Sequence, residues 1–273
     1  MELTSSIFLF VIFIAVLCQY MSVSIGVGYG TVLTPLLLII GFLPLQVVPA
    51  VLLSQLAGGM IGGLAHYRLG NIRLDFRRDD RLVKGRMRRL GYLPRSIDAK
   101  IIFVLATCGV AGVLAGVFLA VNIPQTALEI YIGAMVLAIG LMIVFKRSYK
   151  GDLSWKGLLT LGLLGAFNKG VSGGGYVPLV TGGQIISGRE VRSSIGSTTV
   201  AVSIVCAVGF LGYFLVRGDI FWMLVLATCI GSIVAAPFAA LSVKKVNPEK
   251  LRFAIGLTTI VLGAVTLAKT FIS

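Results

Sequence analysis

The residues GVGYGTVLTP at positions 26–35 interrupt the apolar pattern of this chain, and the residues GVSGGGYVP at positions 170–178 interrupt it again. Each stretch opens a short hydrophobic segment, Gly28–Gly41 in the first half of the chain and Gly173–Gly183 in the second. Broken segments at corresponding places in two halves of a membrane protein are typical of the substrate site of a transporter. A shift of 143 positions aligns Gly30 with Gly173, Pro35 with Pro178, Leu36 with Leu179, Val48 with Val191 and Ser54 with Ser197.

The composition places the chain in a membrane. Its 273 residues are 57% hydrophobic and only 12% charged, with a mean hydropathy of +1.00, which is too apolar for a soluble domain. A membrane-spanning helix needs about 20 apolar residues. We therefore predict an all-α integral membrane protein in which two short broken or re-entrant segments accompany eight long transmembrane helices, at Ser5–Ile25, Leu45–His66, Ala99–Val121, Thr126–Phe145, Trp155–Asn168, Val191–Val216, Asp219–Leu241 and Leu251–Ile272.

The net charge of +14 comes from connectors between apolar segments. Of the 24 basic residues, eleven lie between Arg68 and Lys100, four within 146–156 and four within 244–252. Basic connectors mark the cytoplasmic side of membrane proteins, so this charge predicts an orientation and no nucleic-acid partner. The resulting topology has five membrane segments in each half, an odd number that inverts the second half. We predict two inverted repeats, residues 1–145 and 146–273, with both termini outside; a re-entrant course of the short segments is the alternative.

The longest polar stretch is the basic connector 68–97, where apolar residues are interspersed with arginines. An amphipathic helix on anionic lipid headgroups is one interpretation, and a solvated orientation loop is the simpler one. These apolar residues are Leu74, Phe76, Leu82, Val83, Met87 and Leu90. Elsewhere, glycines spaced by four allow close helix contact, which we interpret as packing within one subunit, a homo-oligomer interface being the alternative. The pairs are Gly58 with Gly62, Gly59 with Gly63 and Gly112 with Gly116.

The two glycine clusters are the predicted binding site for a small anion. Irregular backbone at membrane depth occurs only where it is buried in protein or lines a polar cavity, and each cluster precedes an apolar half-helix whose N–H groups and dipole favour an anion. Lys169 adds a positive charge if it faces this site, and snorkels to an interface if it does not. The predicted substrate-binding residues are Gly28, Tyr29, Gly30, Thr31, Ser54, Gln55, Lys169, Ser172, Gly173, Gly174, Gly175, Tyr176, Ser197, Thr198 and Thr199.

These motifs resemble the sulfite exporter TauE/SafE (TSUP) family of anion permeases. The resemblance rests on Gly26-Val-Gly-Tyr-Gly with Pro35, on the Gly41-Phe-Leu-Pro-Leu that follows, and on Gly170-Val-Ser-Gly-Gly-Gly-Tyr-Val-Pro178 with the later Ser197-Thr-Thr. It covers essentially the whole chain, although Tyr29 interrupts the glycine run that family members often show. The resemblance implies an all-helical permease for sulfite, organosulfonates or related organic acid anions.

Two other functions fit parts of this sequence. The Gly170-Val-Ser172-Gly-Gly segment fits a serine-nucleophile pattern, but His66 is the only histidine and is predicted at the cytoplasmic end of its helix, away from Ser172. An anion channel, or a membrane subunit of a larger assembly, is the stronger alternative. No phosphate-binding loop motif occurs, so the chain is not predicted to be an ATP-driven pump. The prediction is therefore a multi-pass permease of the plasma membrane that is not an enzyme and has no cofactor or metal, because the four cysteines lack zinc-site spacing.

Overall fold

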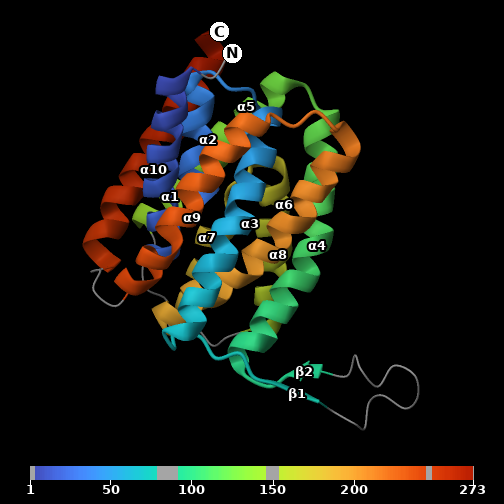
Figure 1. The fold of residues 1–273 in the computed structure, drawn as a ribbon, viewed down its shortest axis with the longest axis vertical. Helices are drawn as coiled ribbons and strands as arrows, with labels where there is room; N and C mark the ends of the chain where they lie inside the picture. Colours follow the sequence, from blue (N-terminus) through green and yellow to red (C-terminus); the bar gives the residue numbers. More distant parts are fainter. Residues whose placement is uncertain (1–3, 79–91, 146–153, 244–247, 273) are drawn as a thin grey trace.

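The computed structural model describes residues 4–78, 92–145, 154–243 and 248–272. The described residues form ten α-helices and one antiparallel pair of short strands, so the predicted all-α membrane class is confirmed (Figure 1). The helices are α1 (Ser5–Ile25), α2 (Tyr29–Ile40), α3 (Pro44–Arg68), α4 (Ile97–Asn122), α5 (Gln125–Phe145), α6 (Trp155–Ser172), α7 (Tyr176–Ile186), α8 (Val191–Arg217), α9 (Trp222–Ser242) and α10 (Pro248–Ile272). The strands are β1 (Phe76–Arg78) and β2 (Tyr92–Pro94).

Glycines with positive φ end α1 and α6 and start the two short helices. Gly26 has φ of 79° and its N–H donates to Ser22 O, which closes α1, and Gly173 has φ of 71° and donates to Lys169 O, which closes α6. The N-caps of α2 and α7 are Gly28 (φ 97°) and Gly175 (φ 83°). Only glycine adopts these angles without steric cost. The chain therefore reverses direction sharply at both glycine clusters.

The helices α2 and α7 are too short to cross a bilayer. They have 12 and 11 residues. At about 1.5 Å per residue each is roughly 17 Å long, against a hydrocarbon core of about 30 Å. Their starting residues lie against each other in the middle of the bundle, where a Cβ atom on Gly30 would fall 1.7 Å from Gly173 O. From there they run to opposite ends of the molecule.

We call these ends the outer and the inner end. The outer end holds the start of α1 and the end of α10 (Figure 1). The last turn of α2 also lies there, as shown by the hydrogen bond that Lys269 Nζ of α10 donates to Leu38 O at 2.7 Å. The inner end holds the β1–β2 pair, and α7 ends there because Arg189, just after α7, pairs with Asp98 at the start of α4. Each short helix therefore forms, with the long helix before it, a hairpin whose tip lies inside the bundle. The two hairpins enter from opposite ends.

The backbone relates the two halves by a different shift from the sequence alignment. The positive-φ glycines Gly26 and Gly173, Gly28 and Gly175, and Gly41 and Gly188 are each 147 residues apart. The alignment of identical residues gave 143 and is one helical turn out of register. In the structural correspondence Tyr29 matches Tyr176, each the first residue of its short helix, and Ser54 matches Ala201 instead of Ser197.

Helix contacts repeat between the two halves. Matching the elements in order pairs α1 with α6, α2 with α7, α3 with α8, α4 with α9 and α5 with α10. Helix α4 packs against α6, and its counterpart α9 packs against α1. Likewise α3 packs against α9, and its counterpart α8 packs against α4. In two further pairs, α3 with α8 and α5 with α10, each helix packs against its own counterpart.

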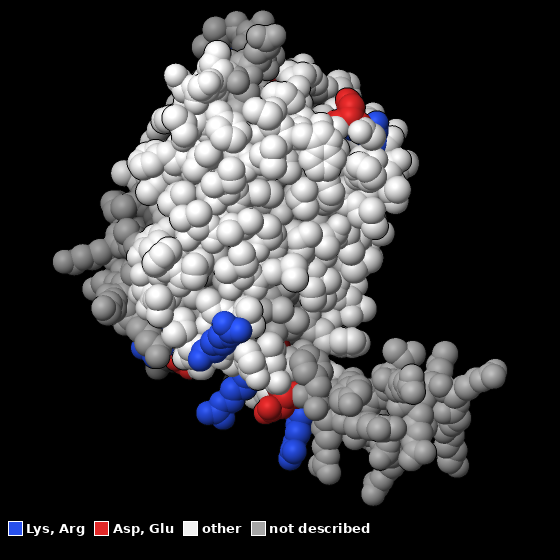
Figure 2. Space-filling model, viewed as in Figure 1, with Lys and Arg blue, Asp and Glu red and all other residues white. Residues whose placement is uncertain are grey.

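The surface is apolar and the interior carries polar side chains. Phe118, Leu215 and Phe145 are more than 70% exposed, whereas Gln55, Lys169 and others lie buried. Figure 2 shows an apolar wall between two ends that carry the charged side chains. Among the described residues six helices, α1, α3, α4, α5, α8 and α9, are long and apolar enough to cross a membrane. The multi-pass prediction is confirmed, and the count of eight long spans stays a prediction for α6 and α10.

The glycine pairs on α3 and α4 contact helices of the same chain. Gly58 lies against Ser232 of α9 and Gly59 against Ser203 of α8, while Gly112 and Gly116 lie against the backbone of α6. The interpretation of these pairs as packing within one subunit is confirmed. Because these glycine pairs contact helices of the same chain, they do not indicate a subunit interface, and a homo-oligomer stays a prediction.

The described flanks of the basic connector are not helical. Residues 76–78 pair antiparallel with residues 92–94, Phe76 opposite Pro94 and Arg78 opposite Tyr92. The interpretation as an amphipathic helix therefore does not hold for these flanks. Leu82, Val83, Met87 and Leu90 lie outside the described residues, so contact of this connector with lipid headgroups stays a prediction.

Cysteine labelling tests which end faces the cytoplasm. In a variant with Cys18, Cys108, Cys206 and Cys229 replaced by alanine, D219C at the outer end is expected to react with a membrane-impermeant maleimide in intact cells. R95C at the inner end is expected to react only after the membrane is opened, since basic residues stay on the cytoplasmic side. If R95C reacted in intact cells and D219C did not, the inner end would face away from the cytoplasm, opposite to the predicted orientation.

Candidate functional site

The tips of the two helical hairpins touch without any side chain between them. A Cβ atom on Gly174 would lie 3.1 Å from both Gly30 C and Gly30 O, and one on Gly30 would overlap Gly173 O. The N–H of Gly175 donates to Thr31 Oγ1 at 3.1 Å. We call Gly30, Thr31 and Gly173–Gly175 the hairpin crossing. Glycine at Gly30 and Gly174 is what permits backbone to meet backbone here.

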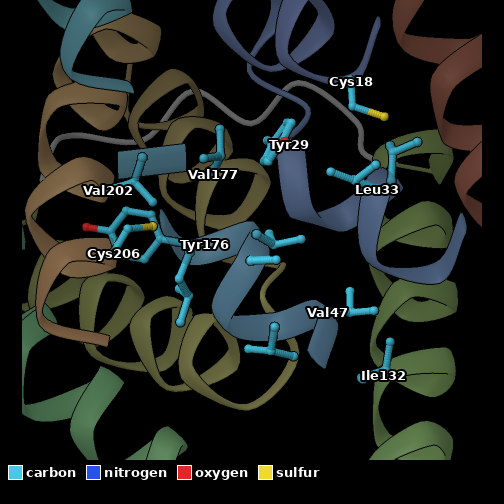
Figure 3. Close-up of a cluster of buried hydrophobic side chains, with 14 of the residues drawn as sticks. Cys18, Tyr29, Leu33, Val47, Ile132, Tyr176, Val177, Val202 and Cys206 are labelled. Atoms are coloured by element: carbon cyan, nitrogen blue, oxygen red, sulfur yellow. The ribbon is translucent and has the colours of Figure 1, made fainter. Parts of the chain in front are cut away.

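Two buried residues of the short helices, Thr34 of α2 and Tyr176 of α7, have an unpaired hydroxyl. Within the part of the chain that the structure describes, Thr34 Oγ1 and Tyr176 OH have no hydrogen-bond partner, and both residues are fully buried. Thr34 Oγ1 would lie 3.0 Å from a Cβ on Gly173, so it faces the crossing. Figure 3 shows the Tyr176 ring next to Cys206 and Val202 of α8. Buried polar groups normally have a partner, so these two hydroxyls point to a bound molecule or water in some state of the protein.

Lys169 is buried against the crossing and does not snorkel. It lies in the last turn of α6, and its side chain is one of the largest that are fully enclosed. The ammonium donates to Gln55 Oε1 of α3 and to Gly173 O. The structure therefore brings Lys169 and Gln55 together with the glycine clusters, as the sequence predicted. Both acceptors are neutral.

Other predicted site residues serve the packing of the helices. Tyr29 OH donates to Thr228 O of α9 at 3.3 Å, and Ser232 Oγ of α9 donates to Ser54 O at 2.7 Å. Ser172 Oγ accepts the Gly174 N–H at 3.1 Å and donates to Asn168 O, which shapes the turn after α6. Gly28 lies next to Thr31 and Pro178. These residues surround the crossing and have internal partners.

Ser197, Thr198 and Thr199 do not lie at the crossing. Gln184 near the end of α7 donates to Thr198 Oγ1 at 2.8 Å and accepts from Ser197 Oγ at 3.1 Å. Thr199 Oγ1 donates to Ile195 O of its own helix at 2.8 Å. Because α7 runs from the crossing to the inner end, this polar group lies one short helix away from the crossing.

Arg189 makes hydrogen bonds to several side chains of this inner polar group. Its guanidinium donates to Gln184 Oε1, to Ser193 Oγ at 2.7 Å and to Ser197 Oγ at 3.4 Å, and it forms an ion pair with Asp98. Asp98 also accepts the N–H of Arg73 at 2.9 Å. The side chains of Arg189 and Asp98 are only 10% and 11% exposed. One residue thus joins α7, α8, α4 and the connector before β1.

A polar cavity opens beside this ion pair at the inner end. Its volume is about 1020 Å³, and its lining includes three arginines and two aspartates. The lining residues are Arg73, Leu74, Asp75, Arg95, Ser96, Ile97, Asp98, Arg189 and Ser193. None belongs to the predicted set, because sequence reasoning took charges next to membrane segments as orientation signals. The available signal was Asp98 itself, one of few acidic residues and placed at the start of an apolar helix.

The arrangement excludes the serine-protease alternative. His66 pairs through Nδ1 with Asn71 Nδ2 at 3.0 Å, at the inner end of α3. Ser172 lies at the crossing, with its hydroxyl bound to the backbone. A nucleophilic serine needs a base within hydrogen-bond reach, and His66 is on a different part of the molecule.

Comparisons with known proteins agree with this architecture. The chain is 26% identical over 274 aligned residues to the "Probable membrane transporter protein YtnM" of Bacillus subtilis (strain 168), an alignment that covers 96% of this chain and 83% of that protein. No solved structure matches the chain. The family model described as sulfite exporter TauE/SafE matches residues 88–266. These findings indicate a membrane transporter and confirm the prediction that the chain is not an enzyme. The chain belongs to the sulfite exporter TauE/SafE family.

Proposed function

We propose that the protein is a secondary permease of the plasma membrane for small anions, namely sulfite, organosulfonates or related organic acid anions, and that the anion crosses the bilayer at the hairpin crossing. The observation that carries the proposal is a buried lysine at the meeting point of two half-helix starts. The positive ends of both helix dipoles and the Lys169 ammonium favour an anion there. The unpaired hydroxyl of Thr34, which faces Gly173, supplies a further hydrogen-bond donor.

Passage of an anion requires the crossing to open. In the described conformation the glycine backbones are in contact and Thr31 bonds to Gly175, so there is no room for an anion between them. The cavity at the inner end reaches the Arg189–Asp98 pair. We infer that an anion enters through this cavity, and that relative movement of the two hairpins exposes the crossing to one end and then the other.

Two inverted repeats, residues 1–145 and 146–273, fit this cycle. The 147-residue spacing of the special glycines and the repeated helix contacts support such repeats. An internal two-fold relation lets one half adopt the arrangement of the other, which exchanges inward and outward access. Opposite entry of the two hairpins is the geometry that this exchange needs.

Counterflow in proteoliposomes tests the proposal. Vesicles loaded with unlabelled sulfite, sulfate, methanesulfonate or acetate are expected to take up the same radiolabelled anion transiently above equilibrium for at least one of the four. K169M should reduce this counterflow at least about tenfold, the value of one lost charged hydrogen bond of roughly 1.5–3 kcal/mol. The matched control is K100M, which removes an exposed lysine at the start of α4.

Two outcomes would contradict the proposal. Uptake without any counterflow would indicate a channel. Full counterflow by K169M would place the anion path away from the hairpin crossing.

A further inference from the structure

The charge of Lys169 has no ionic partner among the described residues. The ion pairs there join Arg189 to Asp98 near the inner end and Arg217 to Asp219 near the outer end. Glu129 interacts with Gln125 and Thr270. Lys169 is left with two neutral acceptors, the Gln55 amide oxygen and the Gly173 carbonyl.

Among the described residues, no acidic side chain of the elements packed around Lys169 contacts its ammonium. The titratable groups that face this end of α6 are the hydroxyl of Tyr131 on α5, which bonds to Asn168, the phenol of Tyr176 on α7, and Cys206 and Tyr213 on α8. On the neighbouring helices α4 and α2 the titratable groups are Cys108 and Tyr29. The α3 group in contact with Lys169 is Gln55, which does not titrate. Phenols and thiols are uncharged near neutral pH, so none balances an ammonium.

A buried ammonium without a counter-charge is costly. Removing an ion from water costs several kcal/mol even after relaxation, and the dipole at the end of α6 returns at most about 2 kcal/mol. The amine has two stable conditions: neutral with its two acceptors, or protonated with an anion beside it. A bound anion favours the proton, and by thermodynamic reciprocity the proton favours the anion to the same degree.

We propose that Lys169 couples anion movement to protons, so that one proton binds to its amine with the anion and leaves with it. This inference rests on the proposed anion permeation through the hairpin crossing. The proton adds to the nitrogen lone pair when the anion enters and returns to water when the anion departs, and no other bond changes. A monovalent anion then crosses without net charge, and the buried site never holds an uncompensated charge. The protein is an anion–proton symporter.

The first test uses the wild-type protein in proteoliposomes. The probe is whichever of sulfite, sulfate, methanesulfonate and acetate gives the largest counterflow, with uptake by protein-free liposomes subtracted to remove diffusion of the neutral acid. An inside-alkaline gradient of one pH unit is expected to accumulate the anion by about tenfold, since one proton per anion transfers the whole gradient. A trapped pH dye should report acidification when the anion is added outside.

A second test uses variants of the lysine. K169R carries a permanent charge and K169Q carries none, so neither moves a proton. The readout is the accumulation ratio at steady state, which is independent of how fast a variant transports. The ratio is expected to fall to one in both variants and to stay near tenfold in K100R.

The results separate the two proposals. Counterflow in the wild-type protein with no accumulation under a pH gradient would overturn the coupling and leave the permease intact. Accumulation that persists in K169R or K169Q would remove Lys169 from the coupling. Absence of counterflow for every probe would defeat the permease and the coupling together. If both variants fail to fold, the wild-type accumulation ratio decides alone.

Discussion

Replacing Gly30 by alanine is expected to abolish transport. The new Cβ would lie 1.7 Å from Gly173 O and 2.6 Å from Gly173 C, and both atoms are backbone. No rotamer change relieves such an overlap, so the two hairpin tips must separate. Overpacking of a close contact costs about 1–3 kcal/mol, and more when backbone must move. We expect at least a tenfold loss of counterflow and a lower melting temperature in detergent.

The matched control for G30A is G157A. Gly157 also lies in a helix, near the start of α6, but its nearest neighbour there is Ser154 Cβ at 3.7 Å, an ordinary contact. Alanine is favoured over glycine in a helix by about 1 kcal/mol. G157A should therefore transport as the wild type does and melt no lower. Normal counterflow by G30A would show that the hairpin tips do not need to touch during the cycle.

The glycine pattern shows how far the sequence could predict the site. Two half-helices with glycine-rich starts were predicted correctly, because hydropathy and the special backbone angles of glycine are local properties. The register was wrong because identical residues were aligned. Pro35 and Pro178 match by letter, yet Pro35 is the seventh residue of α2 and Pro178 the third of α7. What the halves share is the position of left-handed glycines, and a sequence shows glycines without their angles.

The same error of register grouped polar residues that lie apart in the structure. The shift of 143 made Ser54 and Ser197 counterparts, so both were assigned to one pocket. In the structure Ser54 bonds through its carbonyl to Ser232 of α9, and Ser197 bonds to Gln184 near the inner end. Lys169 and Gln55 were each assigned to the site because they lie next to a broken segment, and in the structure they are in contact although 114 positions separate them.

Long-range charge pairs were beyond sequence reasoning. Asp98 and Arg189 are 91 positions apart, and each alone resembles the flanking charges that set membrane orientation. Their pairing depends on where the end of α7 meets the start of α4. That meeting follows from the hairpin geometry, which places α7 at the inner end. The residue that organises the inner cavity could therefore be found only after the fold was known.

Breaking the Arg189–Asp98 pair on one side is expected to destabilise the protein strongly. R189Q leaves the Asp98 carboxylate with about a tenth of its side chain exposed and without its cation, and it also removes the bonds to Ser193 and Ser197. Loss of one partner of a buried pair costs about 3–5 kcal/mol, and the residual exposure places this pair near the lower value. The apparent melting temperature in detergent should fall by several degrees.

A double-mutant cycle separates the ion pair from its surroundings. D98N alone is expected to destabilise the protein, and R189Q with D98N should cost clearly less than the sum of the two, by a coupling of about 1–3 kcal/mol. The control is the exposed Arg217–Asp219 pair at the outer end, whose side chains are 33% and 67% exposed. R217Q should change stability by less than about 1 kcal/mol, as surface pairs do.

Arg189 is expected to matter for transport beyond stability. Its guanidinium lies between the inner cavity and the polar group of Gln184 and Ser197, on the proposed route of the anion from the inner end to the hairpin crossing. R189K keeps the charge but loses the planar fork that holds Asp98 and Gln184 together. Counterflow by R189K should drop several-fold when corrected for the amount of folded protein in the vesicles. Additive stability losses in the cycle would show that Arg189 and Asp98 do not stabilise each other. Wild-type counterflow by R189K would show that the planar guanidinium is not needed for transport.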